Sequence, residues 1–333
     1  MKQTEDQLVQ AIRKVLSGDA PGVVVGVGDD AAVIEPGDHH GILTTDLLVD
    51  GVHFEVDRIL PHDLGHKAVT VNVSDVAAMG GSPRFGVASL GLAPGVEAAW
   101  VIELCGGMRE ASDEYGMAIV GGDTSRADRV TISVTVYGEV AEGEAVTRAG
   151  ARPGDRLVVT GSLGTAAGGL RLAAGSRSEV RGRLSTEAGR AAVAALQRPV
   201  ARVGEGQELA RAGATAMMDL SDGLALDLHR MCRESEVGAR LSLQAVPVAP
   251  VVLDLAPALD VDPLDLALHG GEDYELLAAL PPGAVEDARR RLAERFGTPL
   301  HEVGEVTGRD VGVTAVGPDG GRPLEARGWD HFA

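Results

Sequence analysis

Acidic residues recur beside short apolar runs, in company with Gly, Ser or Thr. The pattern occurs five times, at 26–30, 44–46, 72–75, 121–124 and 219–223. We expect each to form a turn that exposes its carboxylate. Carboxylate, hydroxyl and carbonyl oxygens are hard ligands that suit Mg²⁺ or Ca²⁺ better than zinc. Asp is also common in turns and helix caps for purely structural reasons, an alternative that suffices for any one turn. Five such turns together favour several Mg²⁺ ions bound with a polyphosphate.

The pattern at 219–223 is the most informative of the five. Residues 215–220 predict a strand and 224–234 predict a helix, with Asp219, Ser221 and Asp222 at their junction. These side chains therefore lie at the carboxyl end of a strand and the N-terminus of a helix. Open sheets tend to bind phosphate at that position.

The usual phosphate-binding motifs do not occur in this sequence. It has no G-x-x-x-x-G-K-[ST], no G-x-G-x-x-G followed by an acidic residue about 20 positions on, and no H-R-D. Lysine occurs only as Lys2, Lys14 and Lys67. Neutralisation of a polyphosphate would therefore depend on metal ions, arginine and helix dipoles.

Composition excludes several other classes of protein. The net charge of −19 argues against a nucleic-acid partner, which requires a basic surface. No apolar run approaches the ~18 residues of a membrane span, and the polar N-terminus does not resemble a signal peptide. Cys105 and Cys232 cannot form a disulfide framework. We expect a cytoplasmic protein without a membrane partner.

The length of 333 residues predicts roughly two domains at about 150 residues each. The turn-rich stretch 143–154 places their boundary, giving domains 1–145 and 146–333. The fold class is α/β or α+β, and the charged segment 176–187 is expected to be a mobile loop. Apolar periodicity predicts helices at 5–16, 62–79, 96–115, 161–174, 188–196, 203–212, 224–234 and 285–296, and strands at 22–27, 31–34, 41–49, 85–92, 117–120, 129–140, 156–160, 215–220, 274–280 and 301–306.

A family resemblance becomes specific when the motifs are taken in order. GVGDDAAVI, TTDLLVDGVHF, GHKAVTVNVSDVAAMGGSPR, GGDTSR, TRAGARPGD, MMDLSDGLALDLHR, GGEDYELL and GWDHF together resemble thiamine-monophosphate kinase, of the aminoimidazole-ribonucleotide-synthetase-like superfamily. The motifs extend over nearly the whole chain. The resemblance implies an N-terminal ATP- and Mg²⁺-binding domain whose sheet pairs across a homodimer. It also implies a C-terminal α/β domain that completes the nucleotide and thiamine phosphate site.

The resemblance also implies roles for individual residues. Metal-site residues would be Asp30, Thr44, Thr45, Asp46, Asp75, Asp123, Asp219 and Asp222. ATP would contact Gly122, Asp123, Arg148 and Ser221, and thiamine monophosphate would contact His53, Glu272 and Trp329. From residue type alone, His53 could be a loop histidine, Arg148 a surface ion-pair residue, Glu272 a cap and Trp329 a packing anchor.

The implied reaction transfers the γ-phosphoryl group of ATP directly, in line, to thiamine monophosphate, the last step in making thiamine diphosphate. The acceptor phosphate has a second pKa near ~6 and is largely dianionic at pH 7, so we expect no protein general base. Three alternatives stay open: a sister ribonucleotide synthetase, a non-catalytic nucleotide- or Mg²⁺-binding module, and a metal-dependent phosphohydrolase.

Overall fold

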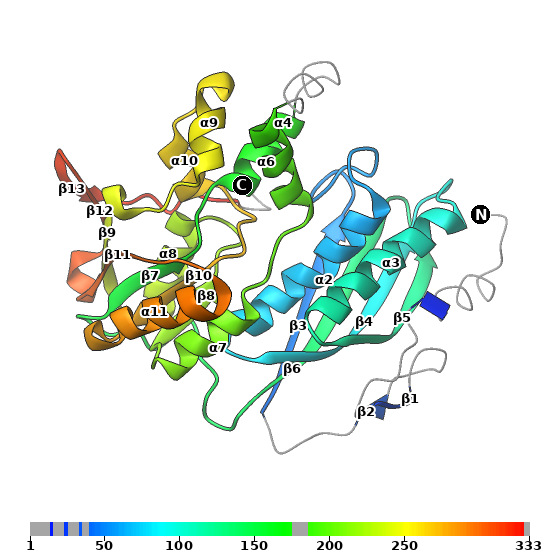
Figure 1. The fold of residues 1–333 in the computed structure, drawn as a ribbon, viewed down its shortest axis with the longest axis horizontal. Coiled ribbons are helices and arrows are strands. Elements are labelled where there is room, and N and C mark those ends of the chain that lie inside the picture. Colours follow the sequence, from blue (N-terminus) through cyan, green and yellow to red (C-terminus); the bar gives the residue numbers. More distant parts are fainter. Residues whose placement is uncertain (1–13, 16–22, 26–32, 35–39, 175–185, 330–333) are drawn as a thin grey trace. The chain divides into compact units, whose positions relative to one another are not determined.

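The computed structural model describes residues 14–15, 23–25, 33–34, 40–174 and 186–329 (Figure 1). The chain divides into two compact units. Unit 1 comprises Met1–Val76 and Gly81–Glu144, and unit 2 comprises Ala77–Gly80 and Ala145–Ala333. Both combine a sheet with helices, as the α/β or α+β class predicts. Among the described helices, none is long and apolar enough to cross a membrane.

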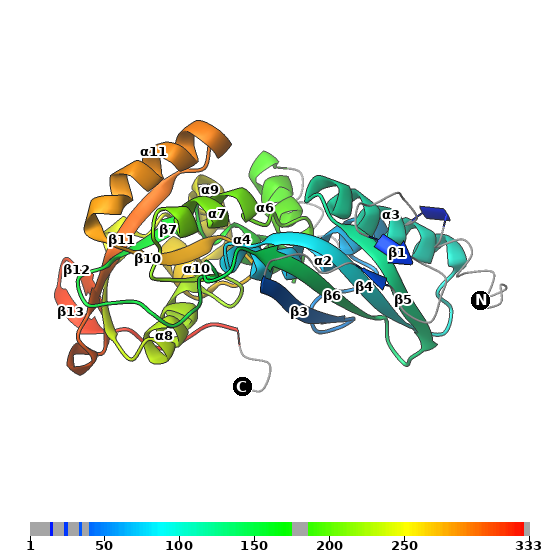
Figure 2. The ribbon, with the colours of Figure 1, turned by 90° about the horizontal axis from the view of Figure 1, so that it is seen from below.

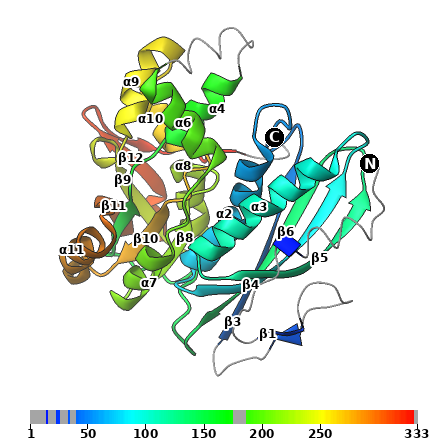
Figure 3. The ribbon, with the colours of Figure 1, turned by 45° about the vertical axis from the view of Figure 1, so that its right-hand side comes forward.

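Unit 1 contains a four-stranded sheet in the order β3-β6-β4-β5. Its strands are β3 (His40–Val49), β4 (Ser82–Leu92), β5 (Ala118–Arg126) and β6 (Thr131–Val140). β4 and β5 run parallel, whereas β6 pairs antiparallel with both β3 and β4. Helices α2 (Pro61–Ala78) and α3 (Ala98–Glu114) lie along one face of this sheet (Figure 3). A separate short pair is formed by β1 (Val23–Val25) and β2 (Val33–Ile34).

Strand alternation in β6 gives the sheet of unit 1 two different faces. Ile132, Val134 and Val136 are buried on the helix side, and the residues between them are more exposed. Glycine lets the two covering helices touch. A Cβ at Gly65 would lie 1.9 Å from the Leu104 carbonyl oxygen, so only glycine permits this approach.

Unit 2 is built on a seven-stranded sheet in the order β13-β12-β9-β11-β7-β10-β8. Among these described strands, only β12 and β9 pair in parallel. Helices α7 (Val203–Arg211) and α11 (Val285–Phe296) cover one face, and α8 (Leu224–Glu234) covers the other (Figure 2). The strands are β7 (Arg156–Thr160), β8 (Ala216–Asp219), β9 (Gly238–Ser242), β10 (Leu276–Leu280), β11 (Leu300–Thr307), β12 (Val313–Gly317) and β13 (Gly320–Pro323).

Two apolar layers hold these helices to the sheet because successive strand residues point to opposite faces. Val158 and Met217 pack with Leu209 of α7 and with α11, whereas their neighbours Val159 and Met218 pack with α8. A further group of helices packs around two small apolar clusters, one formed by Leu172, Ala192 and Leu255 and the other by Ala167, Val252 and Leu266. The group comprises α4 (Thr165–Ala173), α6 (Glu187–Gln197), α9 (Pro250–Leu259) and α10 (Pro263–His269). Elsewhere in unit 2, single 3₁₀ turns occur at η1 (Leu243–Ala245), η2 (Pro282–Ala284) and η3 (Arg309–Val311).

The expectation of five acidic turns was wrong for three of them. Thr44–Asp46 lies inside β3, Asn72–Asp75 inside α2, and Gly121–Asp123 inside β5. In β5 the glycine serves strand packing, because a Cβ at Gly122 would lie 1.9 Å from the Ala88 carbonyl oxygen of β4. The pattern at 219–223 does join a strand to a helix, as predicted. Residues 26–30, with Asp30, lie outside the described residues, and so does most of 176–187.

Candidate active site

Four polar residues of unit 1 form a hydrogen-bonded group, here called the β3–α2 cluster: Thr44, Asp46, Asn72 and Asp75. The Thr44 hydroxyl donates to Asp75 Oδ2 at 2.6 Å, and the Asp46 backbone N–H donates to Asn72 Oδ1 at 2.8 Å. Asn72 Nδ2 in turn donates to the Ala68 carbonyl one turn earlier, at 2.9 Å. Two side chains of α2 therefore fix the strand that carries Thr44 and Asp46.

Asn72 was not among the residues predicted from sequence. It is fully buried and lies three positions before Asp75, so both face β3 from the same side of α2. The three-residue spacing between Asn72 and Asp75 on a predicted helix is the sequence signal from which Asn72 could have been predicted. Asn72 holds the backbone of a predicted metal residue, whereas Asp75 offers the carboxylate itself.

Thr45 and Asp123 lie on the other face of the sheet. The Thr45 hydroxyl donates to the Val134 carbonyl at 3.0 Å and accepts from the Thr135 hydroxyl at 2.9 Å. Asp123 is exposed on β5, and β3 and β5 are opposite edges of the sheet. Three strand spacings amount to about 14 Å. The sheet of one chain therefore does not bring Asp123 to the β3–α2 cluster.

The donor atoms of the β3–α2 cluster suit Mg²⁺ with a bound phosphate. Asp46, Asp75 and Thr44 offer carboxylate and hydroxyl oxygens, the hard ligands that this ion prefers. Among the residues the structure describes, no group of three or more His, Cys, Asp and Glu side chains could hold a metal ion. Mg²⁺ commonly takes only one or two protein carboxylates and completes its shell with water and phosphate, so a sparse carboxylate set fits it.

His53 is held in a defined orientation by the turn that follows β3. Its Nδ1 accepts the backbone N–H of Val49 at 2.9 Å, and Gly51 opens the turn with φ of 79°. An accepting Nδ1 places the proton of the neutral ring on Nε2. The ring is therefore arranged to donate a hydrogen bond from Nε2 rather than to take up a proton there.

In unit 2 four of the predicted residues gather around one turn, here called the SDG turn: Leu220–Gly223, between β8 and α8. Its carbonyl groups accept hydrogen bonds from two distant segments. The Glu272 N–H donates to the Ser221 carbonyl at 2.7 Å, and the Trp329 N–H donates to the Asp222 carbonyl at 3.0 Å. The backbone thus brings Ser221, Asp222, Glu272 and Trp329 together.

Glycines allow these segments to approach the SDG turn. A Cβ at Gly271 would lie 2.5 Å from the Ser221 carbonyl oxygen, and one at Gly328 would lie 2.5 Å from the Asp222 carbonyl oxygen. Any larger residue at either position would push the segment away. Glu272 itself has a left-handed backbone, with φ of 70°, which is uncommon for a residue with a side chain. Glycine is therefore sterically required in the motifs GGED and GW, where the backbone packs against the SDG turn.

The carboxylate of Asp222 is paired with an arginine of α8. Arg230 Nη1 lies 2.5 Å from Asp222 Oδ2 and 2.8 Å from Asp227 Oδ1. Asp227 is fully buried, and its Oδ2 accepts the N–H groups of Asp222 and Gly223, each at 3.1 Å. Burial, with the nearby negative charge of Asp222, raises the pKa of Asp227 to about 6. Asp227 and Arg230 were not predicted from sequence.

Comparison with known proteins now identifies the family. Models described as AIR synthase related protein, N-terminal domain and C-terminal domain, match residues 28–140 and 152–316. The chain is 36% identical over 318 residues to thiamine-monophosphate kinase of Escherichia coli K12, covering 93% of each protein. The chain belongs to the thiamine-monophosphate kinase family.

Solved structures of the family have the same fold. The thiamine-monophosphate kinase of Stenotrophomonas maltophilia K279a matches with a TM-score of 0.81 at 33% identity, covering 98% of this chain and 99% of that one. A structure described as AaThiL complexed with AMPPCP and TMP matches with a TM-score of 0.76 at 32% identity, covering 98% and 97%. The resemblance inferred from the ordered motifs is thereby confirmed.

The remaining predicted site residues of this family member differ in their surroundings. Trp329 is 45% exposed, so its ring is not a packing anchor of the core. Arg148 is exposed and makes no ion pair with any residue that the structure describes, which leaves its guanidinium available. Asp219 is only 3% exposed at the end of β8, paired in register with Leu276 of β10.

Asp273, next to Glu272, anchors the start of α4. Its Oδ2 accepts the Gly164 N–H at 2.8 Å, and the N–H groups of Thr165 and Ala166 also point to it. Asp273 is half-buried by surface area, yet protein atoms crowd its carboxylate and raise its pKa to about 8. The segment that presents Glu272 is therefore tied at one side to the SDG turn and at the other to α4.

Proposed function

We propose that this protein transfers the γ-phosphoryl group of ATP to the phosphate of thiamine monophosphate. The bond between the γ-phosphorus of ATP and the β,γ-bridging oxygen breaks. A new bond forms between that phosphorus and an oxygen of the acceptor phosphate. The products are ADP and thiamine diphosphate. One observation of the structure carries the proposal: the SDG turn collects Ser221, Asp222, Glu272 and Trp329 through backbone hydrogen bonds. The chain's membership of the family supports it.

The main obstacle to such a transfer is repulsion between two anions, together with their alignment. When bound, Mg²⁺ ions would neutralise phosphate charge. We assign one set of ligands to Asp46, Asp75 and Thr44 of the β3–α2 cluster in unit 1, and a separate set to Asp219 and Asp222 beside the SDG turn in unit 2. Asp30, Thr45 and Asp123 remain further proposed metal residues.

The remaining residues are proposed to bind the two substrates. Arg148 would pair with ATP phosphates, and Ser221 would donate a hydrogen bond to the nucleotide. Gly122 and Asp123 of unit 1 are also proposed to contact ATP. The exposed Trp329 ring suits the flat, cationic thiazolium through stacking and cation–π attraction, and Glu272 adds a negative charge nearby. His53 Nε2 would donate a hydrogen bond to thiamine monophosphate.

No protein general base enters the proposed mechanism. The acceptor phosphate carries its own nucleophilic oxygen, already deprotonated near pH 7. His53 is the one histidine among the predicted site residues, and its Nδ1 already accepts the Val49 N–H. Alignment by the bound ligands and charge neutralisation then account for the chemistry.

We also propose that a second copy of this chain pairs with the sheet face of unit 1 that carries Thr45. Leu43 and Leu47 on β3 are 73% and 52% exposed, and Val87 on β4 is 37% exposed. Exposed apolar side chains gathered on one sheet face favour association. The homodimer would cover this face, and the cytoplasmic location stays a prediction.

The function is tested by measuring ADP and thiamine diphosphate together. The protein is incubated with ATP and Mg²⁺, with and without thiamine monophosphate, and the products are separated by chromatography. The expected result is ADP that forms only with the acceptor, in equal amount to thiamine diphosphate. Asp75→Asn should abolish both products, because it keeps the shape of the β3–α2 cluster and removes one of its two carboxylates. Asp319→Asn, an exposed residue between β12 and β13, is the matched control.

Other outcomes point to other functions. ADP and inorganic phosphate without the acceptor would indicate a phosphohydrolase. ATP binding without any ADP would indicate a nucleotide-binding module. Acceptor-dependent ADP with an aminoimidazole precursor instead of thiamine monophosphate would indicate a sister synthetase.

A further inference from the structure

The carboxylate of Asp222 already has a cation of the protein's own. Arg230 Nη1 lies 2.5 Å from Asp222 Oδ2, and the two side chains are 28% and 23% exposed. An ion pair so shielded from water is stronger than one on an open surface. Any divalent cation that binds Asp222 must therefore compete with this guanidinium.

The same arginine serves a second carboxylate, which is fully buried. Arg230 Nη1 also lies 2.8 Å from Asp227 Oδ1, while Asp227 Oδ2 is occupied by the N–H groups of Asp222 and Gly223. Asp227 cannot exchange Arg230 for water, because it has no exposed surface. One guanidinium thus bridges two carboxylates, only one of which is accessible.

We propose that Arg230 is a positioning residue that competes with a divalent cation for Asp222. Without the cation, the guanidinium bridges both carboxylates and holds Asp222 in place. When the cation binds Asp222, the guanidinium stays on Asp227 alone. The inference rests on the proposed function, which makes Asp222 a metal ligand.

The competition has a consequence for the order of binding. It lowers the affinity of Asp222 for a free cation, since the ion pair must be given up. Phosphate oxygens add ligands to the cation and offset that loss. The cation therefore binds Asp222 mainly together with the nucleotide.

The test measures Mn²⁺ binding to the full chain without nucleotide, from the electron paramagnetic resonance signal of free Mn²⁺. Arg230→Met keeps most of the side-chain volume and removes the charge, and should tighten binding of one Mn²⁺ by about tenfold. Arg233→Met removes a positive charge from the same helix, at an exposed residue paired with Glu234, and should change nothing. In an Asp222→Asn background the gain from Arg230→Met should disappear.

A second variant guards against loss of the fold. Arg230→Lys keeps a positive charge beside both carboxylates, which contact a single nitrogen of Arg230, so it retains part of the competition and the gain should be smaller, about threefold. Unchanged or weaker Mn²⁺ binding in both variants, or a gain that persists with Asp222→Asn, overturns the proposal. The kinase assay is independent of this test. If thiamine diphosphate forms but the Arg230 variants bind Mn²⁺ with unchanged affinity, only the role of Arg230 is refuted. If no thiamine diphosphate forms, the proposed function is refuted.

Discussion

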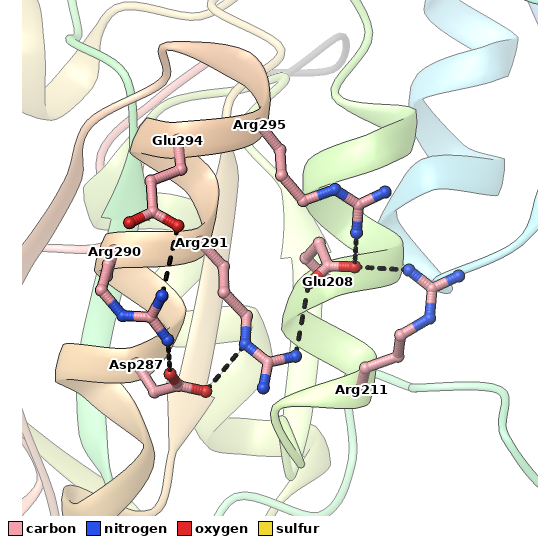
Figure 4. Close-up of polar contacts among 7 residues, drawn as sticks. All are labelled: Glu208, Arg211, Asp287, Arg290, Arg291, Glu294 and Arg295. Carbon is pink, nitrogen blue, oxygen red and sulfur yellow. Dashed lines mark hydrogen bonds and ion pairs between the residues drawn. The ribbon is translucent and has the colours of Figure 1, made fainter.

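Unit 2 buries carboxylates in two different ways. On α7, Glu208 is only 2% exposed and faces three arginines: Arg211 at 2.6 Å, Arg291 at 3.8 Å, and Arg295. Figure 4 shows these guanidinium groups converging on Glu208 from α7 itself and from α11. Arg291 also pairs with Asp287 at 2.8 Å, which extends the network along α11. We call this group the Glu208 cluster.

Around the SDG turn the balance of charge is reversed. Two carboxylates, Asp222 and Asp227, share one arginine, and the nearby Asp273 has only backbone N–H groups as its described partners. The pKa values of Asp227 and Asp273 are raised to about 6 and about 8, with burial as the largest cause in both.

The difference separates a structural role from the binding role proposed for the SDG turn. A carboxylate surrounded by several cations fixes two helices to each other and has no charge left for a ligand. A carboxylate with too few cations keeps its capacity for a metal ion or a proton, at some cost in stability. Substitutions in the two regions should therefore move different measurements.

The largest effect is expected at Asp222. Asp222→Asn removes a proposed metal ligand and should lower kcat for thiamine diphosphate formation about 100-fold or more. The melting temperature should change little, because Asp227 retains Arg230. Steady-state kinetics and thermal melts of the same preparation check this. A large drop in melting temperature with normal turnover would show that Asp222 has a structural role, like Glu208, and would contradict a binding role for the SDG turn.

Glu208→Gln should show the opposite response. The amide leaves three arginines without their shared anion, and the free energy of unfolding should fall by about 2 kcal/mol, a value reduced because the arginines are half exposed. Turnover per folded molecule should stay within about twofold of the original. Urea denaturation and kinetics measure the two quantities, and a turnover defect at full stability would contradict the structural role.

Asp273 should make stability depend on pH. Its pKa is about 8 when folded against 3.8 ordinarily, so the folded protein binds the proton more tightly. The stabilisation is fully present below pH ~4 and is lost as pH rises toward 8, by at most about 1.4 kcal/mol per unit. Asp273→Asn should remove this slope. Urea denaturation of both proteins at pH 5 and pH 7.5 gives the difference, and parallel slopes would refute the assignment.

The smallest effect is expected from one arginine of the Glu208 cluster. Arg295→Met leaves Glu208 with Arg211 and Arg291, so the free energy of unfolding should fall by less than about 1 kcal/mol. Part of that loss would come from the cation–π contact of the Arg295 guanidinium, which lies over the Phe296 ring at 5.3 Å from its centroid. Thermal melts check this. A loss as large as that of Glu208→Gln would show that the three cations do not substitute for one another.

Much of the fold could be predicted from apolar periodicity. The alternation at 129–140 predicted β6, and the helical spacing at 224–234 matched α8 residue for residue. The strand predicted at 117–120 was too short, because Gly121 and Gly122 indicated a turn although β5 continues through them as an edge strand. Strands β9, β12 and β13 were not predicted. β13 is entirely exposed, so no buried face marks it in the sequence.

The local structure around one group of proposed site residues could be predicted from the sequence. Asp219 ends a strand, and Ser221 and Asp222 lie between that strand and a helix, and both elements are visible in the sequence. Arg230 and Asp227 were missed because charged residues on a helix usually face solvent. Only the fold shows that Asp227 is buried beneath the SDG turn. The roles assigned to the individual site residues stay predictions.

The two glycine contacts on the SDG turn have a consequence for how the protein folds. Gly271 and Gly328 come from segments far downstream of the turn, and the Trp329 N–H donates a hydrogen bond to it. Contacts between segments distant in sequence form late, because loop closure must precede them. The proposed substrate-binding surface would thus be among the last parts to assemble, after the sheet of unit 2 is in place. Partly folded chains would keep a stable framework while lacking recognition of the substrate.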